Sequence, residues 1–328
     1  MPLKTETLIL THSDCDGICA GALALARFPD ARMFFTKPIS LLHDLEETAI
    51  PMRPKRLVIC DIALTKIHAA EIVRMLAGLS KTTNILYFDH HSLPQTASLD
   101  AVNDVVSTFA HDTSASASEI AYRHFQKSLP MERVWLALYG AIGDYTDDTE
   151  FVKERMRNWD KRALYFEVST LILGIKDEQF SKYNAKRRIC RTLASGKNPS
   201  DVRGLARAAK YAVTREFEIY KQVKRRAKMF GNVGYVKDLP KFGFRGPSAL
   251  FAATVTSKPI GLSAHTVRDK IDITARKRVD NPNIRLNLIM EQAAEAVGGS
   301  GGGHPRAAGA RIPRGTLNRF LEEVDKMV

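Results

Sequence analysis

The chain has 328 residues, enough for about two domains, and 45% of them are hydrophobic. With only 20 Gly and 14 Pro, the composition excludes a collagen-like, low-complexity or disordered protein. No apolar run approaches the roughly 20 residues of a membrane-spanning helix, and the first residues lack the order of a signal peptide. We therefore expect no membrane partner and, because the four cysteines are scattered, a cytoplasmic, reducing location.

The charge is divided unevenly between the two halves of the chain. Residues 1–150 hold 13 Lys and Arg against 19 Asp and Glu, whereas residues 151–328 hold 36 against 17. A net charge of −6 is thus followed by one of +19. A basic half of this size is typical of a protein that binds a polyanion, most often nucleic acid. A solvated surface that only aids solubility is the alternative.

Short apolar runs alternate with helical patterns in the first half. Strands are predicted at residues 7–11, 56–62, 84–88 and, more weakly, 105–109. Helices are predicted at residues 17–27, 66–79 and 114–126, with a further apolar, helix-like stretch at 134–142. Continuously apolar strands that are separated by helices are typical of a parallel α/β sheet.

The second half begins with a helical, basic segment and ends in a smaller α/β region. The basic clusters are Lys186-Arg187-Arg188 and residues 221–228 (KQVKRRAK), which we expect to contact phosphates. Strands are predicted at 232–236, 260–267 and 270–276, followed by a helix at 286–297, a glycine loop, and a last helix from Gly315. We predict one domain over residues 1–195, a helical connector over 196–230, and a second domain over 231–328.

Acidic and imidazole side chains follow the predicted strands of the first half. They are His12, Asp14 and Asp16 after the first strand, Asp61 after the second, Asp89, His90 and His91 after the third, and Asp144 after the stretch 134–142. Ligands of open α/β sheets bind at the carboxyl ends of the strands. Crowded carboxylates repel one another unless a cation is present, and carboxylates mixed with imidazole suit Mn²⁺ or Mg²⁺. Two such ions about 3.5–4 Å apart can activate a water and hold a phosphate.

Each of these groups has an ordinary structural explanation when it is taken alone. An Asp after a strand is often a helix cap, and a pair of histidines is often part of a surface loop. Residues 298–309 (GGSGGGHPRAAG) could be a flexible linker, or their successive N–H groups could bind an anion with His304 as a further donor. The joint occurrence of these groups, in this order, favours a metal and phosphate site.

The motifs SDCDG (13–17), CD (60–61), FDHH (88–91) and GAIGD (140–144) together resemble the DHH phosphoesterase family. Residues 298–309 are similar to the GGGH signature of the family's smaller C-terminal domain. The resemblance implies an α/β fold with an N-terminal parallel-sheet domain, a helical connector and a smaller C-terminal α/β domain, with the active-site cleft between them. It also implies a metal-dependent phosphoesterase with two Mn²⁺ ions, for which Mg²⁺ or Co²⁺ could substitute.

The resemblance assigns a role to each matched residue. The implied metal ligands are His12, Asp14, Asp16, Asp61, His90 and Asp144. Asp61 would bridge the two ions, Asp89 would orient His90, and His91 would face the phosphate as a catalytic residue. The implied or candidate substrate-binding residues are Ser114, Arg276, Arg278, Gly301, Gly302, Gly303 and His304. His12 lies closer to Asp14 than the ligand histidine of relatives does, so its role stays open.

The leading prediction is a Mn²⁺-dependent, single-strand-specific exonuclease of the RecJ-like type, acting on DNA, RNA or both. In it a water activated by the two ions attacks the terminal phosphodiester, and a replication or repair protein could be a partner. The first alternative is a nanoRNase that takes short oligonucleotides, or a phosphatase of 3′-phosphoadenosine 5′-phosphate or another small nucleotide. The second alternative is a non-catalytic replication or repair scaffold, against which the complete set of carboxylates and imidazoles argues.

Overall fold

The computed structural model describes residues 6–239, 244–279 and 281–328. The chain divides into two compact units, Met1–Lys210 and Tyr211–Val328. The boundary lies within helix α12 (Leu205–Arg226), so the helix contributes residues to both units. Within the described ranges, every helix is too short or too polar to span a bilayer.

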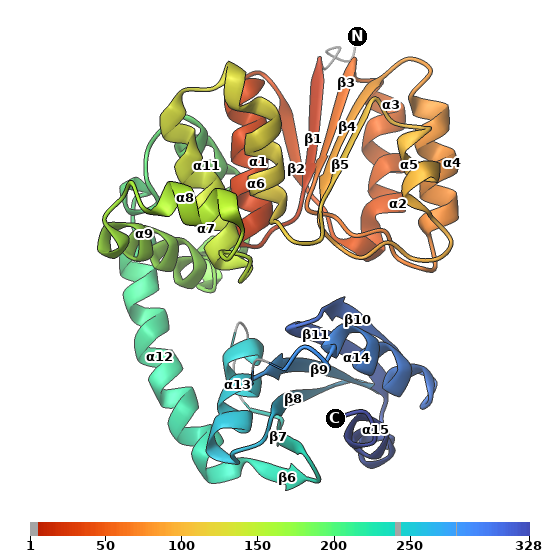
Figure 1. Cartoon of the computed structure of the whole chain (residues 1–328), viewed down its shortest axis with the longest axis vertical. Coiled ribbons are helices and arrows are strands. Elements are labelled where there is room, and N and C mark those ends of the chain that lie inside the picture. The colour runs from red at the N-terminus through yellow and green to blue at the C-terminus, as the bar shows by residue number, and fades with distance from the viewer. Residues whose placement is uncertain (1–5, 240–243, 280) are drawn as a thin grey trace. The chain divides into compact units, whose positions relative to one another are not determined.

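The first unit contains a five-stranded, fully parallel sheet. Its strands are β1 (Thr7–Thr11), β2 (Arg32–Phe35), β3 (Arg56–Cys60), β4 (Asn84–Asp89) and β5 (Thr108–His111). Their order across the sheet is β2-β1-β3-β4-β5 (Figure 1). The predicted parallel α/β sheet is therefore confirmed. Strand β2 was not predicted because its run of four residues, RMFF, is too short to show a pattern.

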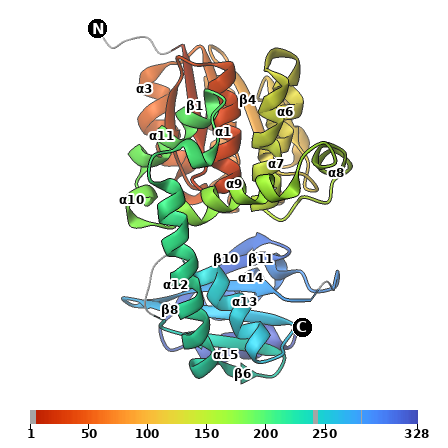
Figure 2. The same cartoon turned by 90° about the vertical axis from the view of Figure 1, so that its left-hand side faces the viewer.

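Helices cover both faces of this sheet (Figures 1 and 2). One face carries α1 (Cys15–Arg27), α6 (Ala117–Phe125), α7 (Val134–Gly143), α8 (Glu150–Met156), α9 (Lys161–Gly174), α10 (Glu178–Ser181) and α11 (Tyr183–Ala194). The other face carries α2 (Leu41–Asp44), α3 (Ile50–Met52), α4 (Ala69–Leu79) and α5 (Leu99–Asn103). Successive strand residues point to opposite faces, so Ile9 packs into the first layer and Leu8 and Leu10 into the second. Both layers are apolar, which explains why these strands are apolar throughout.

The second unit contains a six-stranded mixed sheet. Its strands are β6 (Lys228–Phe230), β7 (Val233–Lys237), β8 (Ile260–Val267), β9 (Lys270–Lys277), β10 (Ser300–His304) and β11 (Ala307–Pro313). The order is β10-β11-β9-β8-β7-β6, and only the pair β7–β8 is parallel. Helices α14 (Leu286–Glu295) and α15 (Leu317–Asp325) share a core with one face, and α13 (Arg245–Val255) packs on the other. The prediction of a smaller C-terminal α/β domain is confirmed.

The predicted glycine loop is wrong, because Ser300–His304 forms the edge strand β10. The strand pairs with β11 in an antiparallel hairpin, with Gly302 opposite Gly309. A Cβ on Gly301 would lie 2.2 Å from the carbonyl oxygen of Met290. Glycine is therefore needed at this position for α14 to approach the strand, a tertiary requirement that a run of glycines does not reveal.

Candidate active site

The three central strands of the first unit bring the predicted ligands together. Strands β1, β3 and β4 are neighbours and parallel, so their carboxyl ends meet at one edge of the sheet. His12 and Asp14 follow β1, and Asp14 also caps α1 by accepting a hydrogen bond of 3.0 Å from the Gly17 N–H. His12 Nδ1 lies 2.8 Å from Asp14 Oδ2, which places both residues within the cluster.

Asp61 lies at the centre of this cluster. It is 2% exposed, and its backbone has a φ of 58°, a left-handed conformation that is uncommon outside glycine and concentrates at functional sites. Its Oδ2 lies 3.6 Å from His12 Nδ1, and its Oδ1 lies 3.4 Å from His90 Nε2. The two oxygens of one carboxylate thus face two different imidazoles.

Asp16 and Asp144 complete the side of the cluster near His90. Asp144 follows α7, and its Oδ2 lies 3.5 Å from His90 Nε2. Asp16 lies in the first turn of α1 and is buried. Its carboxylate accepts hydrogen bonds of 2.7 and 3.0 Å from the N–H groups of Ala117 and Ser118, at the start of α6. Each carboxylate oxygen has a second lone pair, so Asp16 can hold the helix and still bind a cation.

Burial and mutual repulsion shift the pKa values of these groups. Burial and then the charge of Asp61 raise the pKa of Asp16 to about 6. Burial raises the pKa of Asp144 to about 8, against the opposing effect of His90. Burial lowers the pKa of His90, but its hydrogen bond with Asp61 and the surrounding carboxylates outweigh burial and raise the pKa to about 10. The cluster therefore holds protons at neutral pH where a cation could replace them.

The residues fit a divalent metal centre. Among the described residues, two groups of side chains have ligand atoms within 4.8 Å of one another, His12, Asp14 and Asp61 in one and Asp61, His90 and His91 in the other. Asp61 belongs to both groups. Its buried Oδ2 accepts no hydrogen bond from the part of the chain that the structure describes. A buried carboxylate oxygen without a donor is costly, and a bound cation would remove this cost.

Metal binding at pH 7 is expected to release about two to three protons, because His12, His90 and Asp144 must lose theirs to bind cations. The overall association constant for Mn²⁺ should therefore rise about a hundredfold to a thousandfold per pH unit between about pH 6 and 7.5. Calorimetry in two buffers with different ionisation enthalpies measures the number of protons. The Asp144→Asn variant should release about one proton fewer, and an affinity that does not depend on pH would contradict the expectation.

The hydrogen bonds of Asp89 differ from the prediction. Asp89 was expected to orient His90, but its Oδ1 lies 2.9 Å from His91 Nδ1 and its Oδ2 accepts from the His91 N–H at 3.3 Å. This ion pair raises the pKa of His91 despite the opposing effect of burial. His111 Nε2 donates to the His91 carbonyl at 2.7 Å, so two side chains hold the position of His91. His111 was missed, although it ends β5 at the same sheet edge.

Lys186 is a second residue that the sequence analysis misjudged. It is buried, and its Nζ donates to the Ser13 carbonyl at 2.5 Å, in the loop that carries Asp14. Its neighbour Arg187 donates to the Met33 carbonyl at 2.9 Å. The cluster 186–188 is therefore not a continuous surface for phosphates, because two of its three cations hold the fold. The apolar residues Ile189, Cys190 and Leu193 follow Lys186 at helical spacing and already place it on the buried face of α11.

Ser114 and its neighbours form the start of α6. The Ser114 Oγ donates to Asp112 at 2.6 Å, and Ser114 is exposed. The cap of this helix is the buried Ser116, whose Oγ accepts from the Glu119 N–H at 3.1 Å. The backbone after Ser116 donates to Asp16, so this turn supports the cluster directly.

The remaining candidate residues lie in the second unit. Gly301, Gly302, Gly303 and His304 belong to β10, and His304 Nδ1 accepts a hydrogen bond of 3.4 Å from the Arg306 N–H. Arg276 lies opposite Ala307 in the sheet. Arg278 donates through Nε to the Lys258 carbonyl at 2.9 Å, which gives it a structural role. Arg276 and the four residues of β10 thus lie at the β9–β11–β10 end of the sheet.

Comparisons with known proteins match both units. The model of the DHH family, N-terminal domain, matches residues 6–142, and that of the DHHA1 domain matches residues 251–328. Comparison with curated proteins gave no match.

Solved structures with low sequence identity share the fold. The pGpG-specific phosphodiesterase PggH from Vibrio cholerae is 16% identical, with 98% of this chain and 99% of that chain covered and a TM-score of 0.57. RecJ from Thermus thermophilus, solved with Mn²⁺, is 15% identical with a TM-score of 0.68. The match covers 98% of this chain and 52% of RecJ, so the chain spans about half of its length. CDC45 from Entamoeba histolytica is 11% identical, with 99% and 95% covered and a TM-score of 0.59.

The two matched segments contain β10 and most of the candidate metal ligands, whereas Asp144 lies two residues beyond the first segment. Residues 6–142 include His12, Asp14, Asp16, Asp61 and the Asp89-His90-His91 run, and residues 251–328 include His304. The parallel sheet that positions the cluster and the smaller mixed sheet agree with this division. The chain belongs to the DHH family of phosphoesterases and carries a DHHA1 domain at its C-terminal end.

Proposed function

We propose that this protein is a Mn²⁺-dependent phosphodiesterase that removes nucleotides from one end of single-stranded DNA or RNA. The observation that carries the proposal is the position of Asp61, whose two oxygens face the imidazoles of His12 and His90. This arrangement fits a carboxylate shared by two ions. His12 and Asp14 would hold one ion, and Asp16, His90 and Asp144 the other.

His91 is the residue that we propose to contact the reacting phosphate. Its Nδ1 is engaged by Asp89, so its Nε2 can donate to a phosphate oxygen. The ion pair with Asp89 favours the protonated imidazole, which stabilises the negative charge that develops on the phosphate. The divalent ions, when bound, would polarise the phosphate and lower the pKa of the attacking water.

The basic second half supports a polyanionic substrate. Residues 151–328 have a net charge of +19, far more than a single small nucleotide requires. We propose that the second unit binds the strand, with His304 and Arg276 at the β10 end of its sheet among the contacts. A replication or repair protein is the partner class that this proposal includes.

A small-nucleotide phosphodiesterase is the second candidate. It is favoured by the likeness to the pGpG-specific enzyme PggH, which extends over nearly the whole of both chains. The chain's full set of carboxylates and imidazoles argues against the third candidate, a non-catalytic scaffold, although the fold is shared with CDC45.

End-labelled digestion with Mn²⁺ separates these functions. DNA and RNA of about 3 to 30 nucleotides, labelled at either end, are expected to yield products that shorten progressively from one end only. Turnover restricted to strands of fewer than about five nucleotides would favour the small-nucleotide enzyme. The absence of cleavage of these strands with Mn²⁺, Mg²⁺ and Co²⁺ would contradict the proposed exonuclease.

A further inference from the structure

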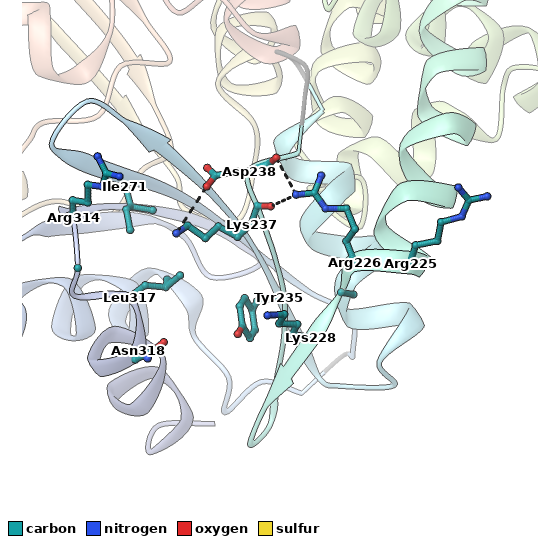
Figure 3. Close-up of a pocket in the computed structure, with 12 residues that line it drawn as sticks. Arg225, Arg226, Lys228, Tyr235, Lys237, Asp238, Ile271, Arg314, Leu317 and Asn318 are labelled. Carbon is teal, nitrogen blue, oxygen red and sulfur yellow. Dashed lines mark hydrogen bonds and ion pairs between the residues drawn. The ribbon is translucent and has the colours of Figure 1, made fainter.

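The second unit contains a basic pocket that the proposed active site does not use. Its volume is about 760 Å³, within the range of roughly 300–1,000 Å³ typical of ligand sites (Figure 3). The lining residues come from the end of α12, the hairpin β6–β7, the start of β9 and the turn before α15. They are Arg225, Arg226, Ala227, Lys228, Tyr235, Lys237, Asp238, Ile271, Arg314, Gly315, Leu317 and Asn318.

Five cationic side chains line this pocket against one carboxylate. The carboxylate, Asp238, is already engaged, because its oxygens accept from the N–H and the hydroxyl of Thr266 at 2.7 and 3.1 Å. Arg226 donates to the backbone carbonyls of Lys237 and Asp238, so it fixes the end of β7. Most of the positive charge of the pocket is therefore not neutralised by its own lining.

The other four cationic side chains of the pocket differ in their contacts with neighbouring groups. The Lys237 Nζ is 3.9 Å from Asp238, a loose ion pair, and Figure 3 shows Arg225 pointing away from the other labelled residues. The side chains of Lys228 and Arg314 make no ion pair or hydrogen bond with any described residue. Like charges that are gathered without an anion repel one another, and a bound anion would relieve this repulsion.

Apolar and aromatic groups lie among these charges. Tyr235 faces Lys228 across the hairpin, and Ile271 and Leu317 line the same pocket. A basic site with an aromatic side chain is the pattern by which proteins bind single-stranded nucleic acid, since phosphates contact the cations and bases stack on the ring. Inorganic anions and acidic peptides do not need the ring.

We propose that this pocket binds the phosphodiester backbone of single-stranded nucleic acid, with a phosphate on Arg314 and Lys237 and a base against Tyr235. This inference rests on the proposed function and goes beyond it, because it assigns strand binding to residues that belong neither to the metal cluster nor to β10. It also gives the basic cluster 221–228 a specific role: its last residues form part of the pocket lining.

The test compares Arg314→Glu with Arg319→Glu. The two residues are five positions apart and both are exposed, but only Arg314 lines the pocket. Binding of a labelled strand of about 20 nucleotides is measured by fluorescence anisotropy in chelator, which prevents cleavage, over a range of salt concentrations. One phosphate contact contributes about −0.7 to the slope of log K against log[salt]. Loss of that contact should therefore lower the binding constant about tenfold near 50 mM salt.

Arg314→Glu is expected to weaken binding about tenfold or more and to reduce the salt slope, whereas Arg319→Glu should change affinity less than about twofold. Lys237→Glu should act like Arg314→Glu. A dinucleotide has a single phosphodiester, which the metal site holds during hydrolysis, so its turnover by Arg314→Glu should equal that of the wild type.

Equal binding by the Arg314→Glu and Arg319→Glu variants would overturn the pocket assignment. A second outcome would also overturn the assignment. If a dinucleotide or pyrophosphate displaced the labelled strand as effectively as an unlabelled long strand does, the pocket would be a site for small ligands. Failure of the proposed function looks different, because the wild type would then cleave none of the labelled substrates, whatever the variants bind.

Discussion

Asp61→Asn is expected to lower phosphodiesterase activity by about 10³-fold or more. Its carboxylate faces both imidazoles of the cluster, so its loss would weaken both halves of the proposed metal centre. A bound metal contributes several kcal/mol to the stabilisation of a transition state, and each 1.36 kcal/mol is a factor of ten in rate. The measurement is kcat/KM on an end-labelled strand, together with the number of Mn²⁺ ions bound per chain.

The variant should keep its fold. Asn tolerates the left-handed backbone at this position, where φ is 58°. His12 retains Asp14 at 2.8 Å and His90 retains Asp144 at 3.5 Å, so neither imidazole loses its last acidic neighbour. The control is Asp148→Asn, which removes an exposed carboxylate four residues after Asp144 and should retain full activity. Activity of Asp61→Asn close to that of the wild type would refute the shared-carboxylate site.

Gly140→Ala is expected to destabilise the first unit by about 3 kcal/mol or more. A Cβ at this position in α7 would lie 1.9 Å from Ser118 Oγ and 2.3 Å from Asp16 Oδ1. Helix propensity alone favours Ala over Gly by about 1 kcal/mol, but overpacking a rigid core costs more. Because Asp16 would be displaced, metal affinity should fall as well. Thermal denaturation should show a melting temperature about 5–10 °C lower.

Gly78→Ala provides the matched control. Gly78 is also helical, in α4, and among the described residues no atom other than those of its chain neighbours and its own helix backbone lies within 4 Å of the position that its Cβ would take. Propensity then acts alone, and the substitution should stabilise the protein by about 0.5–1 kcal/mol. If both variants melted at the same temperature, the close packing of α7 against Asp16 and Ser118 would not be the determinant.

The sequence alone determined the three central strands of the first unit and the place of the cluster, whereas it missed β2 and placed β5 two to three residues too early. Strand β1 has the predicted bounds, and β3, β4 and α7 differ from their predictions by no more than two residues at an end. These elements are buried on both faces or on all sides. Their side chains are therefore mostly apolar, and the resulting apolar runs are easily distinguished in the sequence from the polar turns. The polar residues at their ends, such as Asp61 and Asp144, are conspicuous for the same reason.

Only the tertiary structure decided which polar groups meet. Asp89 pairs with His91 and not His90, Lys186 turns inward to the Ser13 carbonyl, and β10 is a strand where glycines indicated a loop. The basic lining of the pocket likewise comes from segments that are distant in sequence, residues 225–238 and 271–318. Hydrophobic periodicity depends only on a residue and its near neighbours in the sequence. A hydrogen bond or a close backbone approach depends instead on a partner that the fold brings to within about 3 Å. The identity of that partner is not contained in any local sequence pattern.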